Sequence, residues 1–326
     1  MSVKSQQKPR FILALLGKQN RVLTPHERKI KKALSHWQLY LMLLPAVVYL
    51  LIFAYKPMYG IIVAFKDFNF KDGIEGSKWI GLENFDRLFK SYWFPVTVKN
   101  TLTLSFLQLL VSFPFPIIFA LLVNELKNAR AKSLVQTISY APHFISTVVI
   151  CGMLTLFMGK NGGLFNLIIK LFGGEPYAMA GDPKAFPWVY VLSGVWQSCG
   201  WSAIIYFAAL AGVDKSLTEA AELDGASRLQ RIWHINIPVL VPTIMIQLIL
   251  QVGRIMSIGH DKALLLQNSL NLSASEIIST YVYKVGLEQY DYGYSTANSI
   301  FNSVVNCILL ISVNYISKKL TKESLW

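Results

Sequence analysis

Uninterrupted apolar runs of about 20 residues dominate this chain, and that length crosses the ~30 Å hydrocarbon core of a bilayer as an α-helix. The runs are continuous rather than alternating, which excludes an outer-membrane β-barrel. Charged residues make up 15% of the 326-residue sequence, whereas soluble domains carry about 25%. The sequence therefore predicts an all-α membrane protein.

Six membrane-spanning helices are expected, with both termini in the cytoplasm. Residues 1–36 form a basic tail in which nine Lys and Arg residues face only one acid, Glu27. Such an excess of positive charge marks the cytoplasmic side. The predicted spans are residues 38–62, 96–123, 134–158, 188–212, 238–263 and 296–316.

Three parts follow from this topology: the tail 1–36, a six-helix domain 37–318 and a cytoplasmic tail 319–326. Within the first tail, the apolar segment 11–16 is too short to span and is expected to lie on the membrane surface. The net charge of +13 is interpreted as topology and not as a nucleic-acid site, because the four segments predicted to be inside hold 18 of the 31 Lys and Arg residues.

The loop 213–238, between the fourth and fifth spans, carries the clearest local signals. Ser216 and Glu219 have the spacing of a capping box, which predicts that a helix begins at Ser216. Ala220 and Ala221 follow, and their small side chains permit close approach of another backbone. The expected product is a docking helix on the cytoplasmic surface, although an ordinary amphipathic surface helix shows the same pattern.

Gly225 is expected to bend the chain after this helix. A second short helix is predicted over residues 227–235 and should stop near Pro238, because proline has no amide hydrogen to donate. Lys56-Pro57 is likewise expected to break the outer end of the first span.

The segment Glu219–Ala226, followed by Ile235-Asn-Ile-Pro238, resembles the EAA loop of ABC importer permeases. That pattern is Glu-Ala-Ala, a Gly four residues on, and then Ile-x-Leu-Pro, with Ile237 in place of the usual Leu. The form Glu-Ala-Ala-x-x-Asp-Gly-Ala is similar to the carbohydrate-uptake group, which includes the maltose importer's membrane subunits. The resemblance covers residues 38–318 and implies the type I ABC importer permease fold.

Several further segments resemble the branch that imports oligosaccharides of plant or algal polymers, including alginate and polygalacturonate-type importers. The resemblance therefore implies a first membrane subunit that imports acidic oligosaccharides, with a permease for a neutral sugar as the alternative. The matching segments are 54–60, 64–68, Trp79–Phe85, Asn100-Thr101 and Ala141-Pro142.

The family also implies partners: a second homologous permease, two ATPase subunits, an extracytoplasmic sugar-binding protein and membrane lipids. The docking helix would fit a groove on the ATPase, and Glu219 would pair with a basic residue there. The chain has no Gly-x4-Gly-Lys-Ser/Thr loop, so ATP and Mg would bind the partner ATPase and this subunit would be non-catalytic. The implied ATPase-coupling residues are Glu219, Ala220, Ala221, Asp224, Gly225 and Pro238.

Polar residues inside the predicted spans are candidates for a translocation path, because such residues usually face a cavity or a helix interface. Arg254 lies about 24 Å beyond Pro238 at 1.5 Å per helical residue, and a cation there suits a carboxylate. Interhelical packing is the alternative for every amide, and His143 has no second His or Cys at metal-ligand spacing. The candidates are Arg254, Gln251, Gln247, Asn298, Asn302, Gln197, Trp201 and His143.

Two other functional classes are weaker. An ion-coupled secondary transporter would favour acidic residues inside spans, but Glu125 and Asp261 lie at the ends of predicted spans. A membrane enzyme would need an acid, base or metal cluster. The acidic residues Glu219, Glu222 and Asp224 are the candidate, but no His or Cys accompanies them, and the dispersed cysteines give no metal spacing. The long outer segments 66–95, 159–187 and 264–294 are expected to receive the binding protein.

Overall fold

The computed structural model describes residues 37–321, which form two compact units. The first unit ends at Gly60 and consists of helical turns that follow one another without a gap. They are α3 (Trp37–Leu50), the π-helical η1 (Leu51–Tyr55) and α4 (Lys56–Met58). Helix α3 buries no residue within the described chain, and its exposed apolar side chains suit contact with lipid.

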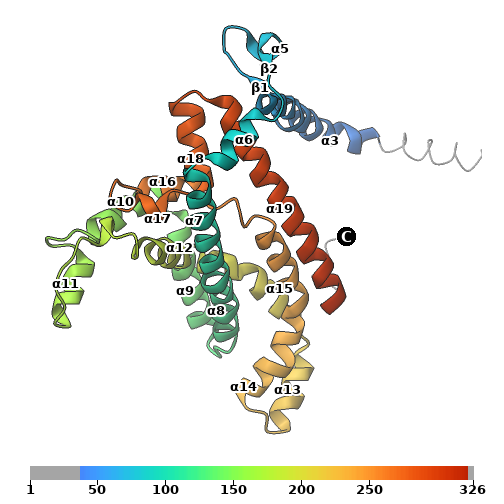
Figure 1. Cartoon of the computed structure of the whole chain (residues 1–326). Coiled ribbons are helices and arrows are strands. Elements are labelled where there is room, and N and C mark those ends of the chain that lie inside the picture. Colours follow the sequence, from blue (N-terminus) through green and yellow to red (C-terminus); the bar gives the residue numbers. More distant parts are fainter. Residues whose placement is uncertain (1–36, 322–326) are drawn as a thin grey trace, which may run out of the picture. The chain divides into compact units, whose positions relative to one another are not determined.

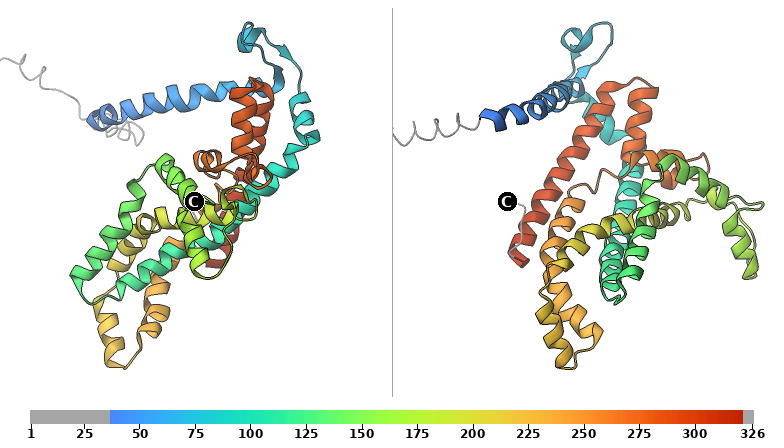
Figure 2. Two further views of the ribbon diagram at one scale, coloured as in Figure 1. Left: turned by 90° about the vertical axis from the view of Figure 1, so that its left-hand side faces the viewer. Right: turned by 180° about the vertical axis from the view of Figure 1, so that it is seen from behind.

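The second unit begins at Ile61 and holds all other elements (Figures 1 and 2). The helix that starts at Trp37 continues through η2 (Tyr59–Phe65) and is 29 residues long. The prediction that Lys56-Pro57 breaks this helix is therefore wrong. The prediction that residues 11–16 lie on the membrane surface falls outside the described residues.

A segment of short strands and helices precedes the next long helix. It contains a two-stranded antiparallel sheet of β1 (Lys66–Asp67) and β2 (Lys78–Trp79), with Lys66 opposite Trp79. Its helices are α5 (Gly73–Gly76) and α6 (Glu83–Lys90).

The remaining helices follow one another along the chain up to Thr321. In order, they are α7 (Trp93–Leu107), η3 (Gln108–Ser112), α8 (Pro114–Asn124), α9 (Ala129–Tyr140), η4 (Ala141–Phe144), α10 (Thr147–Phe157), α11 (Leu164–Leu171), η5 (Met179–Gly181), α12 (Phe186–Ala211), α13 (Lys215–Leu223), α14 (Arg228–Arg231), η6 (Ile232–Asn236), α15 (Ile237–Val252), α16 (His260–Leu266), α17 (Leu272–Ser275), α18 (Ile278–Tyr283), η7 (Lys284–Glu288) and α19 (Tyr292–Thr321).

Four helices of the described chain are long and apolar enough to cross a membrane: Trp37–Phe65, Trp93–Asn124, Arg228–Val252 and Tyr292–Lys319. A fifth span results if α9–η4 and α10 count as one, although they meet at 93°. Helix α12 has 26 residues but is not among these spans. The structure thus shows the largely helical membrane fold, while six spans and cytoplasmic termini stay predictions.

The predicted third span is not straight, because the chain leaves the helix at Ile145 and Ser146. Pro142 has no amide hydrogen, and the Ser146 hydroxyl accepts from the Val149 amide at 3.4 Å to start α10 anew. The Ile145 carbonyl accepts a hydrogen bond from Gln197 Nε2 at 3.2 Å. Side chains therefore satisfy backbone groups that a continuous helix would have paired.

The predicted fifth span, which was expected to reach residue 263, ends at Val252 instead. Asn306 Oδ1 accepts from the Met256 amide at 2.9 Å, and the Ser105 hydroxyl donates to the Ile255 carbonyl. These contacts from α19 and α7 replace the hydrogen bonds of the missing helical turn. Arg254 consequently lies just beyond the end of α15.

The sequence predicted that the helix after Ser227 stops near Pro238. That prediction is wrong, because the helix runs unbroken from Arg228 to Val252. The Ile237 amide donates to the Ile232 carbonyl across the π turn η6. This wider turn seats Pro238 in the first turn of α15, where its missing amide hydrogen and ring are tolerated. The same wide bond, from Phe113 to Gln108, precedes Pro114.

An apolar core cluster joins α8, α12 and α15. Leu121, Tyr206 and Leu240 are among its buried members. A second cluster, around Tyr190 and Leu266, joins α7, α10, α12 and α16. Helix α12 takes part in both and is the central helix of this unit.

Close packing of α12 on α9 gives a stability prediction. A Cβ added at Gly200 would lie 2.2 Å from the Ser139 carbonyl oxygen. We expect Gly200→Ala to lower stability by about 1–3 kcal/mol, because overpacking displaces backbone. Thermal unfolding of the purified complex in detergent measures this.

The matched control is Gly152→Ala in α10, where an added Cβ meets no atom within 4 Å. It should leave the melting temperature unchanged or raise it. Equal melting temperatures for the two variants would contradict the close contact at Gly200.

Candidate functional site

Helix α13 begins at Lys215, one residue before the start that the sequence predicted. The Asp214 side chain, not that of Ser216, caps it by accepting from the Ser216 amide at 2.9 Å. Asp is among the strongest N-cap residues, so it displaces the predicted Ser216–Glu219 capping box. The pKa of the Asp214 carboxyl lies below its usual value because hydrogen bonds from the backbone and side chain of Ser216 stabilise the charged form.

The bend predicted at Gly225 is present, and its geometry requires glycine. Gly225 has φ +78°, a conformation that L side chains rarely adopt. The Ala226 amide donates to the Ala221 carbonyl at 2.9 Å and the Gly225 amide to the Glu222 carbonyl at 3.1 Å. This pair of bonds is a Schellman motif, which closes α13 and reverses the chain into α14.

A capping box that the sequence analysis did not predict occurs at the start of α14. Ser227 Oγ accepts from the Gln230 amide at 3.4 Å, and Gln230 Oε1 accepts from the Ser227 amide at 2.7 Å. Helices α13 and α14 thus lie together at one end of α15 (Figure 1).

The surface of this helix pair is open within the described chain. Glu219 and Ala220 are exposed and Ala221 is half-buried. Four large apolar side chains nearby are at least half exposed: Leu217, Leu223, Leu229 and Trp233. Exposed apolar groups beside a free carboxylate and small residues suit docking of another protein.

A cavity of about 1060 Å³ lies between α7–η3–α8, α12, α15 and the segment leading into α16. Its lining is mixed, with amides, hydroxyls, aromatic rings and cations. Five of the eight predicted path residues line it: Gln197, Trp201, Gln247, Gln251 and Arg254.

The other three predicted path residues do not line this cavity. His143 instead contacts a lining residue. Its ring stacks on that of Trp201, with 4.5 Å between the ring centroids and 3° between the ring planes. Asn298 is 1% exposed because α19 packs this face against its neighbours. Asn302 lies on the same helix, and the side-chain oxygens of both asparagines have no hydrogen-bond partner within the described residues.

Sequence reasoning missed Lys262, which lines the cavity as a second cation. Its ammonium donates to the Tyr190 carbonyl at 2.7 Å and lies 5.0 Å from the centre of the Tyr190 ring. Asp261 is the acid in the lining and contacts His260 at 3.0 Å. The loss of helix after Val252 places these residues at the cavity, and no local sequence pattern predicts that.

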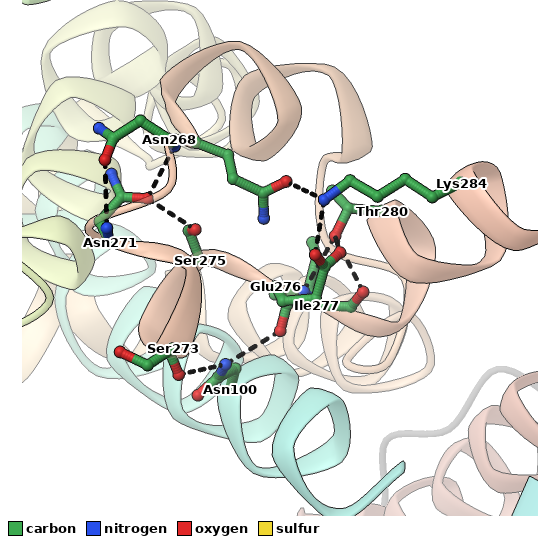
Figure 3. A network of polar contacts seen from close by, with 10 residues as sticks. Asn100, Asn268, Asn271, Ser273, Ser275, Glu276, Ile277, Thr280 and Lys284 are labelled. Carbon is green, nitrogen blue, oxygen red and sulfur yellow. Dashed lines mark hydrogen bonds and ion pairs between the residues drawn. The ribbon is translucent and has the colours of Figure 1, made fainter. Parts of the chain in front are cut away.

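Outside this cavity, a polar network fixes the short helices α17 and α18 onto α7 (Figure 3). Asn100 Nδ2 donates to the Ser273 and Glu276 carbonyls, each at 2.9 Å. The Glu276 carboxylate accepts from Thr280 Oγ1 at 2.7 Å and pairs with Lys284 Nζ at 2.6 Å. The segment 264–294 is therefore a folded platform rather than a free loop.

Among the described residues, no group of three or more His, Cys, Asp or Glu side chains is placed to hold a metal ion. The cysteines Cys151, Cys199 and Cys307 are free thiols.

Residues 94–322 match the model of the family described as "binding-protein-dependent transport system inner membrane component". The chain belongs to this family. As a family member it is a multi-pass component of the inner membrane, and its relatives are transport permease components rather than enzymes.

The permease is similar to two proteins of Bacillus subtilis (strain 168). It is 40% identical over 326 residues to the polygalacturonan/rhamnogalacturonan transport system permease protein YteP, covering 100% of both chains. It is 41% identical to protein LplB, covering 88% of this chain and 91% of LplB.

A solved structure shares the fold of the permease. It is a bacterial ABC transporter involved in the import of the acidic polysaccharide alginate, with 38% identity and a TM-score of 0.83. The match covers 90% of this chain and 100% of that one. A second structure, of an alginate transporter in complex with an alginate pentasaccharide-bound periplasmic protein, gives 37% identity and a TM-score of 0.84, covering 92% of this chain and 100% of that one.

The ion pair of Glu276 and Lys284 gives a second stability prediction. The Glu276 side chain is 4% exposed and that of Lys284 is 25% exposed. We expect Lys284→Met to destabilise the permease by about 3–5 kcal/mol, because it leaves a buried carboxylate without its cation. Thermal unfolding of the purified complex measures the loss.

The double variant Lys284→Met/Glu276→Gln serves as the control, since it also removes the stranded charge. It should recover part of the lost stability. A double variant less stable than Lys284→Met alone would show that the ion pair is not the source of the effect.

Proposed function

We propose that this chain is a transmembrane subunit of an ATP-driven importer for acidic oligosaccharides such as alginate or polygalacturonate fragments. The observation that carries this proposal is the cavity, in which two cations lie among amides and an aromatic ring. Arg254 and Lys262 supply the charge, and Gln197, Gln251 and Trp201 are part of the lining.

The chemistry of this lining suits a charged sugar. A guanidinium binds a carboxylate through two parallel hydrogen bonds. Glutamine amides both donate to and accept from hydroxyls. The face of Trp201 offers an apolar surface for the C–H groups of a sugar ring. Two relatives point the same way, since their names refer to polygalacturonan and to alginate.

The energy for transport would come from ATPase subunits docked on α13. Glu219, Ala220, Ala221, Asp224 and Gly225 form the proposed contact, and Pro238 anchors the loop to α15. ATP and Mg would bind those subunits, so this chain would bind no cofactor. Closure of the ATPases would move α13 and shift the permease between two states.

The remaining partners in the proposal are a second permease, which forms a heterodimer with this chain, and an extracytoplasmic sugar-binding protein. The folded outer segments, including the platform 264–294, are the surfaces proposed to receive the binding protein. A periplasmic protein is bound in the alginate transporter structure, which supports this part of the proposal.

Docking is tested by Glu219→Lys. The substitution should weaken co-purification of the ATPase with the permease at least about tenfold, because it brings like charges together in a desolvated contact. Pull-down of the ATPase with tagged permease measures the effect. Glu175→Lys, an equal charge change on an exposed acid outside α13, is the control. Equal binding by both variants would mean that α13 is not the docking helix.

Substrate class is tested by Arg254→Gln in the assembled transporter. Uptake of labelled uronate oligosaccharides should fall at least about tenfold, as expected when a buried carboxylate loses its charged partner. Uptake of a neutral oligosaccharide should not fall, and Arg254→Lys should retain part of the uronate uptake. Equal loss for both sugars would contradict the carboxylate role, and uptake of neutral sugars alone by the unmodified transporter would replace the acidic substrate with a neutral one.

A further inference from the structure

A buried cation that does not line the cavity lies where α14 meets the end of α8. Arg231 is 8% exposed and closes α14. Its Nη1 contacts Glu222 Oε1 at 3.2 Å and donates to the Ala226 carbonyl at 3.2 Å. Its Nη2 contacts Glu125 Oε2 at 3.4 Å. One guanidinium therefore holds α13, the turn after Gly225 and the end of α8.

The contact to Glu125 joins two parts of the chain that are distant in sequence. Glu125 is the C-terminal cap of α8. Its second oxygen, Oε1, accepts from Asn236 Nδ2 at 3.4 Å, and Asn236 is 5% exposed within η6. Both carboxylate oxygens of Glu125 thus face the segment that follows the docking helix.

Helix α8 leads from this contact toward the cavity. Pro116 and the preceding residues of η3 line the cavity, and Glu125 caps the other end of the helix. Helices α12 and α15 are connected to the docking loop by the backbone itself. Helix α8 has no such connection, because the chain returns to the loop only after α9 to α12.

Apolar packing alone would couple the movement of α8 only weakly to that of the docking loop. The cluster of Leu121, Tyr206 and Leu240 holds α8 against its neighbours, but apolar contacts are non-directional. A guanidinium between two carboxylates fixes both distance and orientation.

Stability is a weak reason for such an arrangement. A buried ion pair can often be replaced by apolar residues without loss of stability, and Arg231 Nε has no hydrogen-bond partner among the described residues. A role in coupling the motion of α8 to that of α13 would explain why the contact is charged, whereas a role in packing would not.

We propose that Arg231 is a positioning residue that makes α8 move with the ATPase-docking helix α13, so that displacement of the loop reaches the cavity wall at η3. This inference rests on the proposed function. It adds a third route from the ATPase to the cavity, beside the two backbone routes through α12 and α15.

The test measures ATP hydrolysis and sugar uptake in the same vesicles, with the complete transporter and its binding protein reconstituted. Arg231→Met should leave the ATPase bound but raise the ATP hydrolysed per sugar imported at least about fivefold, the lower end of typical coupling between sites. Glu125→Gln should act in the same direction. The double variant should be no worse than the stronger single variant, because both remove one bridge.

Arg228→Gln is the matched control, since Arg228 is an exposed arginine of the same helix α14. It removes the same charge without touching Glu125, and its ATP-to-sugar ratio should equal that of the unmodified transporter. Arg231→Lys should give an intermediate ratio, because one ammonium cannot span both carboxylates as a guanidinium does.

Unchanged ATP-to-sugar ratios in Arg231→Met and Glu125→Gln would overturn the inference, even if their thermal stability fell. If Arg231→Met does not assemble, Glu125→Gln decides alone, because Glu125 is the less buried partner. Failure of the unmodified transporter to import any sugar with ATP is a separate result and would overturn the proposed function instead.

Discussion

A chain in hydrocarbon must pair every backbone amide and carbonyl within the protein, and this structure shows how prolines are fitted under that constraint. Pro57, Pro114 and Pro238 each follow a π turn by two residues. In each case the residue before the proline donates to the carbonyl five positions back. The wider turn relieves the clash that a proline causes with the carbonyl four positions back, so three long helices continue through proline.

The same constraint explains what the sequence could and could not predict of the fold. Apolar length located the helices Trp93–Asn124 and Tyr292–Lys319 to within a few residues. It failed at Ile145 and beyond Val252, where hydrogen bonds from Gln197 and Asn306 take the place of helical turns. Such bonds come from residues more than 45 positions away, and no local pattern carries them.

The residues of the candidate site were also predicted only in part. Helical spacing predicted that Gln197 and Trp201 share a face, and both line the cavity. Spacing on α19 is equally regular, yet Asn298 is buried against its neighbours, because periodicity groups residues without saying what the group faces. Lys262 and Arg231 each take their place from a contact with a distant residue, Tyr190 and Glu125 respectively. Neither residue could therefore be chosen from the sequence alone.

The end of α15 at Val252 has a consequence for how transporters of this kind diverge. Arg254 stands on an irregular segment whose position depends on Asn306, a residue of α19 that does not line the cavity. A substitution at Asn306 is expected to shift Arg254 without altering any residue that lines the cavity. Under the proposed function, substrate preference therefore depends also on residues outside the cavity lining, and a comparison of lining residues alone would miss their changes.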